Sequence, residues 1–189
     1  MSTLTRGLPE HLIIKGVKCP IRTDFKTWLI FSQLISNTDE ISQKLPQIFK
    51  LIFYELPPNF FDAMNEMMKF YTRAEIKNNN TCNTGNQKKL FDFEYDADLI
   101  YSAFVQQYKI DLYDTDLHWW KFKALFEGLS DDTHFIKVVQ YRGIDLSKIK
   151  DKEQKKFYQN MKKTYKLPDN RNEEQKETDF INSIEKLFS

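Results

Sequence analysis

Four acidic side chains alternate with other residues in the stretch FDFEYDAD and could in principle bind a metal ion. They are Asp92, Glu94, Asp96 and Asp98. A calcium loop needs ligands at set positions, a glycine at its centre and a bidentate glutamate at its end, and this stretch does not provide them. We interpret these residues as helix-cap and surface acids, and the sequence predicts neither a metal site nor a cofactor.

The histidines also lack a pattern that binds zinc or supports catalysis. Three occur, with no HExxH or zinc-finger spacing between them: His11, His118 and His134. His118 precedes Trp119 near a predicted helix start, where Asp114 or Asp116 could orient it. A general base also needs a nucleophile within reach, and no serine or cysteine nucleophile motif accompanies this histidine. We therefore expect a structural histidine, predict no catalytic residues and do not expect an enzyme.

Phosphate and nucleic-acid binding have little support from the charged residues. The chain contains only 5 glycines and no glycine-rich loop of the kind that cradles phosphate. Lysines cluster towards the C-terminal end of the sequence: Lys148, Lys150, Lys152, Lys155, Lys156, Lys162 and Lys163. Such a cluster could contact nucleic acid, but Asp151 and Glu153 interrupt it and the formal net charge is +1. A solvated helix face explains the cluster, and we do not expect nucleic acid among the partners.

Two adjacent tryptophans stand out in LHWWKFKALFEGLSDD, residues 117–132. Helical spacing places one set of apolar residues on a single face: Trp119, Phe122, Leu125, Phe126 and Leu129. Lys121, Lys123 and Glu127 are expected on the solvent side, with Asp116 as the helix cap. Neighbouring residues on a helix point about 100° apart. One indole can therefore lie in the core while the other meets a neighbouring helix or stays at the rim.

Several short elements must position these residues at the N-terminal end. The apolar runs of HLIIKGVKCPIR flank Gly16 and predict a small β-hairpin. Thr23-Asp24 offers an N-cap for a helix that runs to about Ser36. Because proline is tolerated only near a helix start, we expect another helix to begin at Pro46 and to stop before Pro57.

Further helices follow along the chain. Asn59 is expected to cap a helix whose apolar face comprises Phe60, Met64, Met67, Met68 and Tyr71. The spacing around Leu99 predicts a helix buried on much of its circumference. Another helix is expected from a cap at Ser130 to a stop at Gly143. A charged helix then ends before Pro168, with a narrow apolar stripe at Phe157, Met161 and Tyr165.

A polar stretch at residues 77–89 has no large apolar side chain and contains Cys82, which we expect to be exposed. It is the candidate boundary between two lobes. The prediction is a mainly α protein, helical domain(s) with a short N-terminal β-hairpin. Its parts are a hairpin plus helical lobe (1–76), a polar linker (77–89), a helical lobe (90–168) and an amphipathic tail helix (169–189).

The predicted tail helix lies beyond a polar spacer that begins at Asp169. Its apolar residues share one face: Phe180, Ile181, Ile184, Leu187 and Phe188. Two alternatives stay open, because such a helix either packs on its own core or docks into a groove on a partner. These five residues, together with Trp119 and Trp120, are the candidate partner-binding residues.

The composition fits a folded protein of a reducing compartment. Hydrophobic residues make up 41% of the 189 residues and aromatic residues 15%, enough for a packed core. No apolar run approaches the roughly 20 residues of a membrane helix, and the first residues show no signal-peptide pattern. The two cysteines, Cys19 and Cys82, do not suggest a disulfide framework. We expect a cytoplasmic protein with reduced thiols and no membrane partner.

Specific segments resemble a known phage family. These are FDFEYDADLIYSAFVQQYKIDL, LHWWKFKALFEGL, YRGIDLSKIKDKE and YKLPD, with IRTDFKTWLIFSQLI nearer the N-terminus. They are similar to the bacteriophage family named for gene product fifteen, found in tail modules of long-tailed phages and prophages of Gram-positive bacteria. The resemblance runs from about Gly16 to Pro168.

The resemblance implies a role in virion morphogenesis inside the host bacterial cytoplasm. Genes of this family usually lie between the major tail protein and the tape measure protein, and products of that interval resemble tail assembly chaperones. We expect a non-catalytic chaperone or scaffold whose partner is the phage tape measure protein. Further candidate partners are the major tail protein, an adjacent-frame tail assembly protein and the chain itself as an oligomer. The alternatives are a structural tail or connector component of the virion and, second, a nucleic-acid-binding regulator.

Overall fold

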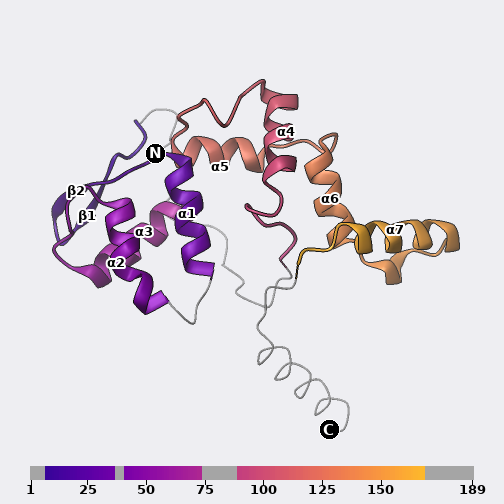
Figure 1. Ribbon diagram of the computed structural model, residues 1–189, viewed down its shortest axis with the longest axis horizontal. Coiled ribbons are helices and arrows are strands. Elements are labelled where there is room, and N and C mark those ends of the chain that lie inside the picture. The colour runs from indigo at the N-terminus through magenta and orange to yellow at the C-terminus, as the bar shows by residue number, and fades with distance from the viewer. Residues whose placement is uncertain (1–6, 37–40, 74–88, 169–189) are drawn as a thin grey trace, which may run out of the picture. The chain divides into compact units, whose positions relative to one another are not determined.

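The computed structural model describes residues 7–36, 41–73 and 89–168; the side chains of residues 36, 41 and 42 are not described. That part of the chain contains two strands, seven α-helices and one 3-10 helix (Figure 1). In chain order these are β1 (His11–Ile14), β2 (Val17–Pro20), α1 (Phe25–Ser36), α2 (Ile41–Ile52), α3 (Phe60–Thr72), α4 (Ala97–Tyr108), α5 (Trp119–Glu127), α6 (His134–Gly143), the 3-10 helix η2 (Leu146–Lys148) and α7 (Lys152–Thr164). The predicted mainly α class with a short N-terminal β-hairpin is confirmed. Residues 77–88 of the predicted linker, Cys82 and the predicted tail helix lie outside the described residues.

The chain divides into two compact units. The larger unit comprises Met1–Gln87 and Asp96–Lys137, and the smaller unit comprises Lys88–Tyr95 and Val138–Ser189. The residues expected to form one lobe at 90–168 are therefore shared between the two units, and α4 and α5 belong with the N-terminal elements.

The predicted hairpin forms through antiparallel pairing of β1 with β2. Leu12 lies opposite Cys19, and both side chains are buried. The turn uses two residues with positive φ, Lys15 at 52° and Gly16 at 79°. Glycine reaches this region without steric cost because it has no β-carbon, so Gly16 allows the tight reversal that the sequence predicts.

The start of α1 is joined to the start of α5 by main-chain hydrogen bonds. The N–H of Phe25 donates to the carbonyl of Leu117 at 2.8 Å, and the N–H of Trp119 donates to the carbonyl of Thr23 at 2.6 Å. Asp24 caps α1 as predicted, since its carboxylate accepts from the N–H of Thr27 at 2.9 Å. These bonds connect segments nearly one hundred residues apart and fix where α5 begins.

Aromatic rings fill the core of the larger unit. Phe25 stacks on Phe122 with centroids 4.8 Å apart, and Phe122 stacks on Phe104 at 5.2 Å. Trp28 is fully buried, and its indole N–H donates to the carbonyl of Arg22 at 2.9 Å. Burial of such large apolar rings is the main source of stability in this unit.

α2 begins earlier than predicted. It starts at Ile41, so Pro46 lies inside the helix, and the prediction that the helix begins at this proline is wrong. Proline removes one main-chain hydrogen bond, but the apolar stripe that follows is buried, with Ile48 and Ile52 fully inaccessible. Packing of this stripe offsets the missing bond. The predicted end before Pro57 is confirmed.

Two predicted helix faces are less buried than expected. On α3 the cap at Asn59 is confirmed, because its side chain accepts from the N–H of Asp62 at 2.9 Å. The α3 residues in the core are Ala63, Met67 and Phe70, whereas Phe60 and Met68 are exposed. On α4 the buried residues are Ile100, Ala103 and Phe104. The expectation that α4 is buried on much of its circumference is therefore wrong.

The starts of α5 and α6 also differ from prediction. The cap of α5 is His118 instead of Asp116. α6 begins at His134, and the buried Thr133 accepts from the N–H of Ile136 at 3.4 Å, so the cap is not Ser130. The Thr133 hydroxyl donates to the Ser130 carbonyl at 2.8 Å, which closes a turn before the helix. Tertiary pairing and this buried turn override the local preference for the earlier residues.

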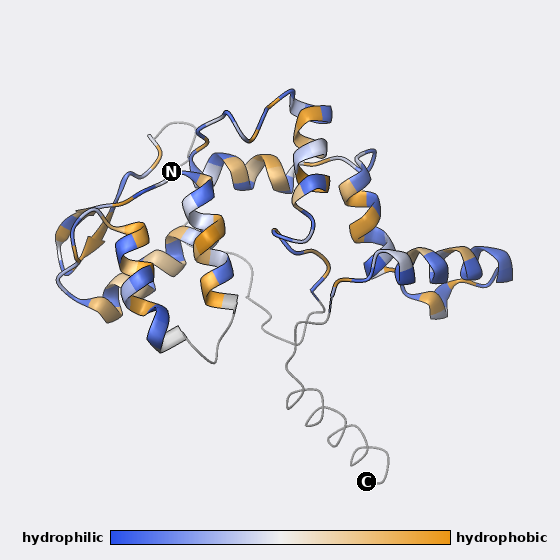
Figure 2. Cartoon of the chain, viewed as in Figure 1, coloured by the Kyte–Doolittle hydropathy of each residue, from blue (hydrophilic) through white to orange (hydrophobic). Residues whose placement is uncertain are grey.

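Hydrogen bonds to main-chain carbonyls hold the smaller unit together. The buried Arg142 of α6 donates through Nε to the carbonyl of Tyr165 and through Nη1 to that of Leu90 at 3.1 Å. Lys162 of α7 donates to the carbonyl of Ile144 at 2.7 Å. No residue of α7 is buried, and hydrophilic residues are prominent along this helix in Figure 2.

Candidate interaction surface

The two adjacent tryptophans cap the C-terminal end of α3. The indole N–H of Trp119 donates to the carbonyl of Tyr71 at 3.0 Å, and that of Trp120 donates to the carbonyl of Phe70 at 2.8 Å. Lys123 adds a contact from Nζ to the Tyr71 carbonyl at 3.3 Å, although we expected it on the solvent side. The last carbonyls of a helix have no partner within the helix. The WWKFK stretch therefore supplies donors that α3 itself lacks.

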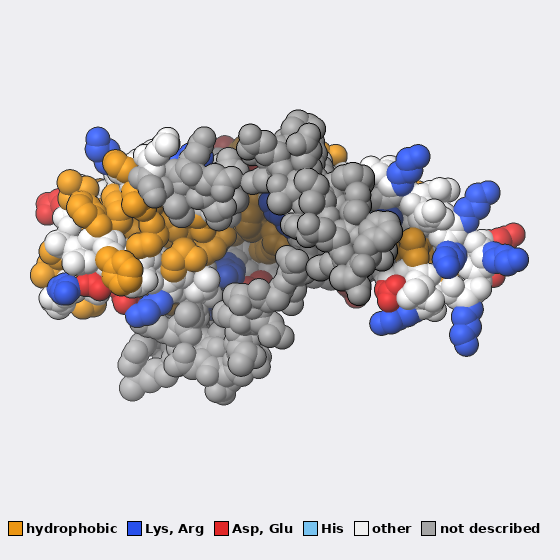
Figure 3. Space-filling model, turned by 90° about the horizontal axis from the view of Figure 1, so that it is seen from below, with side chains coloured by type: hydrophobic (Ala, Val, Ile, Leu, Met, Phe, Trp, Pro, Cys, Tyr) orange, Lys and Arg blue, Asp and Glu red, His pale blue; other side chains and the backbone are white. Residues whose placement is uncertain are grey.

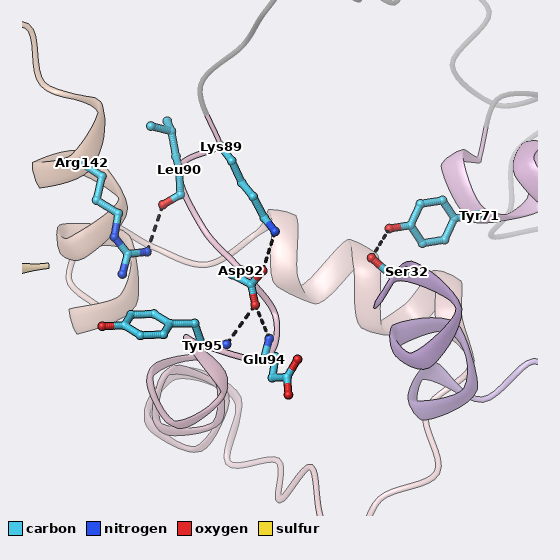
Figure 4. A network of polar contacts seen from close by, with 8 residues as sticks. All are labelled: Ser32, Tyr71, Lys89, Leu90, Asp92, Glu94, Tyr95 and Arg142. Carbon is cyan, nitrogen blue, oxygen red and sulfur yellow. Dashed lines mark hydrogen bonds and ion pairs between the residues drawn. The ribbon is translucent and has the colours of Figure 1, made fainter. Parts of the chain in front are cut away.

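The two indoles differ in burial. Trp119 is 2% exposed and stacks on Tyr71 with ring centroids 5.2 Å apart and planes within 6°. Tyr71 is itself anchored to α1, because its hydroxyl donates to Ser32 Oγ at 2.9 Å (Figure 4). Trp120 is half-buried between Phe70, at 5.3 Å, and the guanidinium of Arg73, at 5.6 Å. Trp119 thus offers no ring surface, whereas part of the Trp120 ring is accessible.

His118 has a structural role that fits its burial. Its Nδ1 accepts from the N–H of Trp120 at 3.0 Å, so Nε2 carries the proton and donates to the carbonyl of Pro9 at 3.0 Å. Partial burial lowers the pKa of this imidazole below its ordinary value, and the nearby Lys121 acts in the same direction. The neutral ring is the form that can cap α5, which agrees with the expected structural histidine.

The acidic stretch has structural roles as well. Partial burial alone would raise the pKa of Asp92, but hydrogen bonds from Lys89 and from the N–H groups of Tyr95 and Glu94 hold it below its ordinary value (Figure 4). Asp96 is the N-cap residue of α4. Within residues 7–36, 41–73 and 89–168, no group of three or more histidine, cysteine, aspartate or glutamate residues could hold a metal ion.

An exposed apolar surface, which the sequence analysis did not identify, lies where α2 connects to α3. We call it the α2–α3 surface. It comprises four large side chains within eight residues: Tyr54 (63% exposed), Leu56 (66%), Phe60 (54%) and Phe61 (75%). Hydrophobic side chains also gather over the end of the molecule that carries α1, α2 and α3 in Figure 3. Large exposed apolar side chains that lie close together mark interaction sites more often than scattered single ones.

The shape of the connection explains why these rings stay outside. Asn59 starts α3 immediately after the two prolines, so the chain turns before its first helical residues can face the core. The ring of Phe60 lies against the buried Phe49, with centroids 4.9 Å apart and planes tilted by 53°. The only local signal in the sequence is the proline pair between two apolar runs, and residue type alone does not distinguish these rings from core residues.

A family model for "Bacteriophage Gp15 protein" matches residues 5–167 of the chain. The chain belongs to the bacteriophage Gp15 family. The match covers most of the sequence and includes the tryptophan caps, the α2–α3 surface and α7, so the resemblance noted from the sequence is confirmed. No curated protein and no solved structure matches the chain.

For this Gp15 family member, the predicted partner-binding residues are placed only in part. Trp119 and Trp120 are brought together at the end of α3, whereas Phe180, Ile181, Ile184, Leu187 and Phe188 lie outside the described residues. Partner binding at all seven residues stays a prediction. In the described part of the chain, no helix has the length and apolar character needed to cross a membrane.

Proposed function

We propose that this Gp15 family protein is a non-catalytic chaperone or scaffold in phage tail assembly, and that it binds the tape measure protein before the tail is complete. Family membership supports the link to a bacteriophage. The observation that carries the chaperone proposal is the α2–α3 surface, where four large apolar side chains within eight residues are accessible. A protein that exposes such rings is suited to cover apolar segments of another chain.

The tape measure protein is the occupant that we propose for the α2–α3 surface. A long helical protein with apolar faces aggregates unless those faces are covered, and aromatic side chains are effective anchors in such contacts. Leu56 and Phe61 are the most exposed apolar residues of the surface. We expect them to insert between side chains of the partner helix, because most of the surface of each side chain is accessible.

Coexpression tests this proposal. With the wild-type protein, we expect the tape measure protein of the same phage to stay in the soluble fraction. The double substitution Leu56→Ser and Phe61→Ser should lower that soluble fraction, while the unbound variant keeps the wild-type melting temperature. Tyr113→Ser is the matched control, because Tyr113 is a large aromatic residue of the same unit that is 69% exposed. Equal precipitation of the tape measure protein with and without this chain would refute the proposal.

The main alternative is a structural tail or connector component of the virion, which Gp15 family membership also accommodates. The two roles differ in what remains in the finished particle. Mass spectrometry of purified virions should not detect this chain if it acts as a chaperone. Detection at a stoichiometry comparable to that of other tail proteins would favour the structural role instead.

A further inference from the structure

α7 presents an apolar stripe that the described residues leave partly uncovered. Phe157, Met161 and Tyr165 recur at every fourth position, yet no residue of α7 is buried and Phe157 is 48% exposed. Tyr141 of α6 lies next to this stripe, with ring centroids 6.3 Å from Phe157 and 6.0 Å from Tyr165. An amphipathic helix gains most of its stability from packing of its apolar face. We therefore expect another segment to pack against the exposed side of the stripe.

The charges around the stripe restrict what that occupant can be. Residues 146–166 contain eight lysines and two acids, and the lysines at 150, 152, 155, 156, 163 and 166 are all exposed. A suitable occupant carries negative charge beside an apolar face. Nucleic acid would neutralise the lysines, but its phosphates would leave the apolar stripe uncovered.

One segment of the same chain has both properties. Residues 169–189 contain six acidic and three basic residues, and five of their apolar residues fall at helical spacing: Phe180, Ile181, Ile184, Leu187 and Phe188. The stripe from Phe157 to Tyr165 spans about 12 Å at the rise of a helix, and the interval from Phe180 to Phe188 spans about the same length if helical. The charge and the length of the segment both complement α7.

The connection allows the segment to reverse direction. α7 ends at Thr164, and Pro168 disfavours its continuation. Fourteen residues separate Tyr165 from Phe180, which is enough chain to return along a helix of this length. We propose that residues 169–189 dock in antiparallel orientation on α7 of the same molecule, with Phe180 near Tyr165, Phe188 near Phe157 and the acids of the segment facing the α7 lysines.

Hydrogen exchange of the full-length protein tests this docking. We expect amides of residues 180–188 to be protected at every protein concentration. Phe157→Asp should lower that protection by about tenfold or more, because it removes a large apolar contact and adds a like charge. Tyr113→Asp, an exposed aromatic of the larger unit, should leave the protection unchanged. Residues 180–188 that exchange freely in the wild type, or stay equally protected in Phe157→Asp, would overturn the proposal. Protection that grows with protein concentration would also overturn it and would point to a second copy.

A charge exchange keeps the proposal testable if Phe157→Asp also unfolds α7. Lys166→Glu should reduce protection of residues 180–188, and adding Asp179→Lys in the same chain should restore it, because the antiparallel docking that places Phe180 near Tyr165 also places Asp179 near Lys166. Failure of Asp179→Lys to restore protection would contradict the docking. A different outcome would assign α7 to nucleic acid instead. In that case the wild type binds duplex DNA, Lys155→Glu together with Lys156→Glu abolishes this binding, and residues 180–188 are not protected.

Discussion

The two units of this protein are stabilised in different ways. The larger unit buries aromatic rings, including Trp28, Phe31, Phe104 and Trp119. The smaller unit has a helix with no buried residue, and its connections include hydrogen bonds from Arg142 and Lys162 to main-chain carbonyls and ring contacts of Tyr141. The first arrangement depends on apolar burial, whereas the second combines polar donors with partly exposed rings, so the two units should respond differently to substitution.

The two units nevertheless share one way of bonding the last carbonyls of their helices. Many helices end with a glycine in the left-handed conformation, but this chain has only 5 glycines. At the ends of three helices, donors from distant segments bond the last carbonyls. Arg22 donates to the carbonyls of Lys50 and Leu51 at the end of α2, two tryptophans serve α3, and Arg142 serves α7. A shortage of glycine is thus compensated by long side chains that also tie elements together.

The largest effect should come from removing the buried indole. Trp119→Ala eliminates a side chain that is 2% exposed and its hydrogen bond to Tyr71, and we expect the free energy of unfolding to fall by about 3–5 kcal/mol. Trp120→Ala removes an equivalent hydrogen bond from a half-buried ring, so its cost should be smaller, about 1–3 kcal/mol. Urea denaturation followed by circular dichroism measures both. Equal losses would mean that capping of α3, and not burial, dominates.

The next effect should be confined to the smaller unit. Arg142→Met keeps an apolar stem but leaves the carbonyls of Leu90 and Tyr165 without their donor. We expect local opening of α7 to become easier by about 2–3 kcal/mol. Hydrogen exchange should show faster exchange in α7 and unchanged exchange in α1. Arg142→Lys, which keeps the charge but not the planar pair of donors, should give an intermediate rate. Equal acceleration in α1 would contradict the separate stabilisation of the two units.

Local signals in the sequence predicted the elements whose determinants lie close together. The caps at Asp24 and Asn59, the hairpin turn at Gly16 and the stop of α6 at Gly143 follow from residues within a few positions. Each depends on side-chain and backbone preferences that act within one turn of chain. The structure confirms them for that reason.

The roles that depend on distant partners could not be predicted. The indoles of Trp119 and Trp120 donate to carbonyls 48 and 50 residues earlier in the chain, and helical spacing indicates only the directions in which they point. His118 caps α5 because main-chain pairing with the Thr23–Phe25 segment sets the helix start, although Asp116 is the stronger capping type. The exposure of Phe60 and Phe61 likewise depends on how α3 packs and not on their residue type.

A smaller effect concerns the pH dependence of the larger unit. Because burial lowers the folded-state pKa of His118, the unfolded chain binds a proton at this residue more tightly than the folded chain does. The contribution of the neutral His118 cap to stability is complete above the ordinary histidine pKa of about 6.5, and it is lost as the pH falls below that value. We expect a loss of about 1 kcal/mol, the typical value of an N-cap. His118→Asn keeps an uncharged cap, so the free energy of unfolding should depend less on pH in this range. His11 and His134 are present in both proteins and do not affect the comparison. The free energy of unfolding is measured by chemical denaturation between pH 7 and pH 5. If it changes equally with pH in the wild type and in His118→Asn, His118 does not titrate in this way.

The smallest expected effect tests whether the scarcity of glycine has a cost. Lys109 follows α4 with a φ of 58°, and its N–H donates to the carbonyls of Phe104 and Val105. A β-carbon in this left-handed region is unfavourable, so Lys109→Gly should raise the free energy of unfolding by about 0.5–1 kcal/mol. Lys109→Ala is the matched control, because it removes the same side chain but keeps the β-carbon, and it should change the stability little. Both variants are compared by thermal denaturation. If Lys109→Ala stabilises the protein as much as Lys109→Gly does, the gain comes from losing the lysine side chain, and the helix end is not strained. If only Lys109→Gly stabilises it, a non-glycine residue at the end of α4 costs stability, and the tryptophan donors at the end of α3, where Arg73 also has a φ of 58°, offset a cost of the same kind.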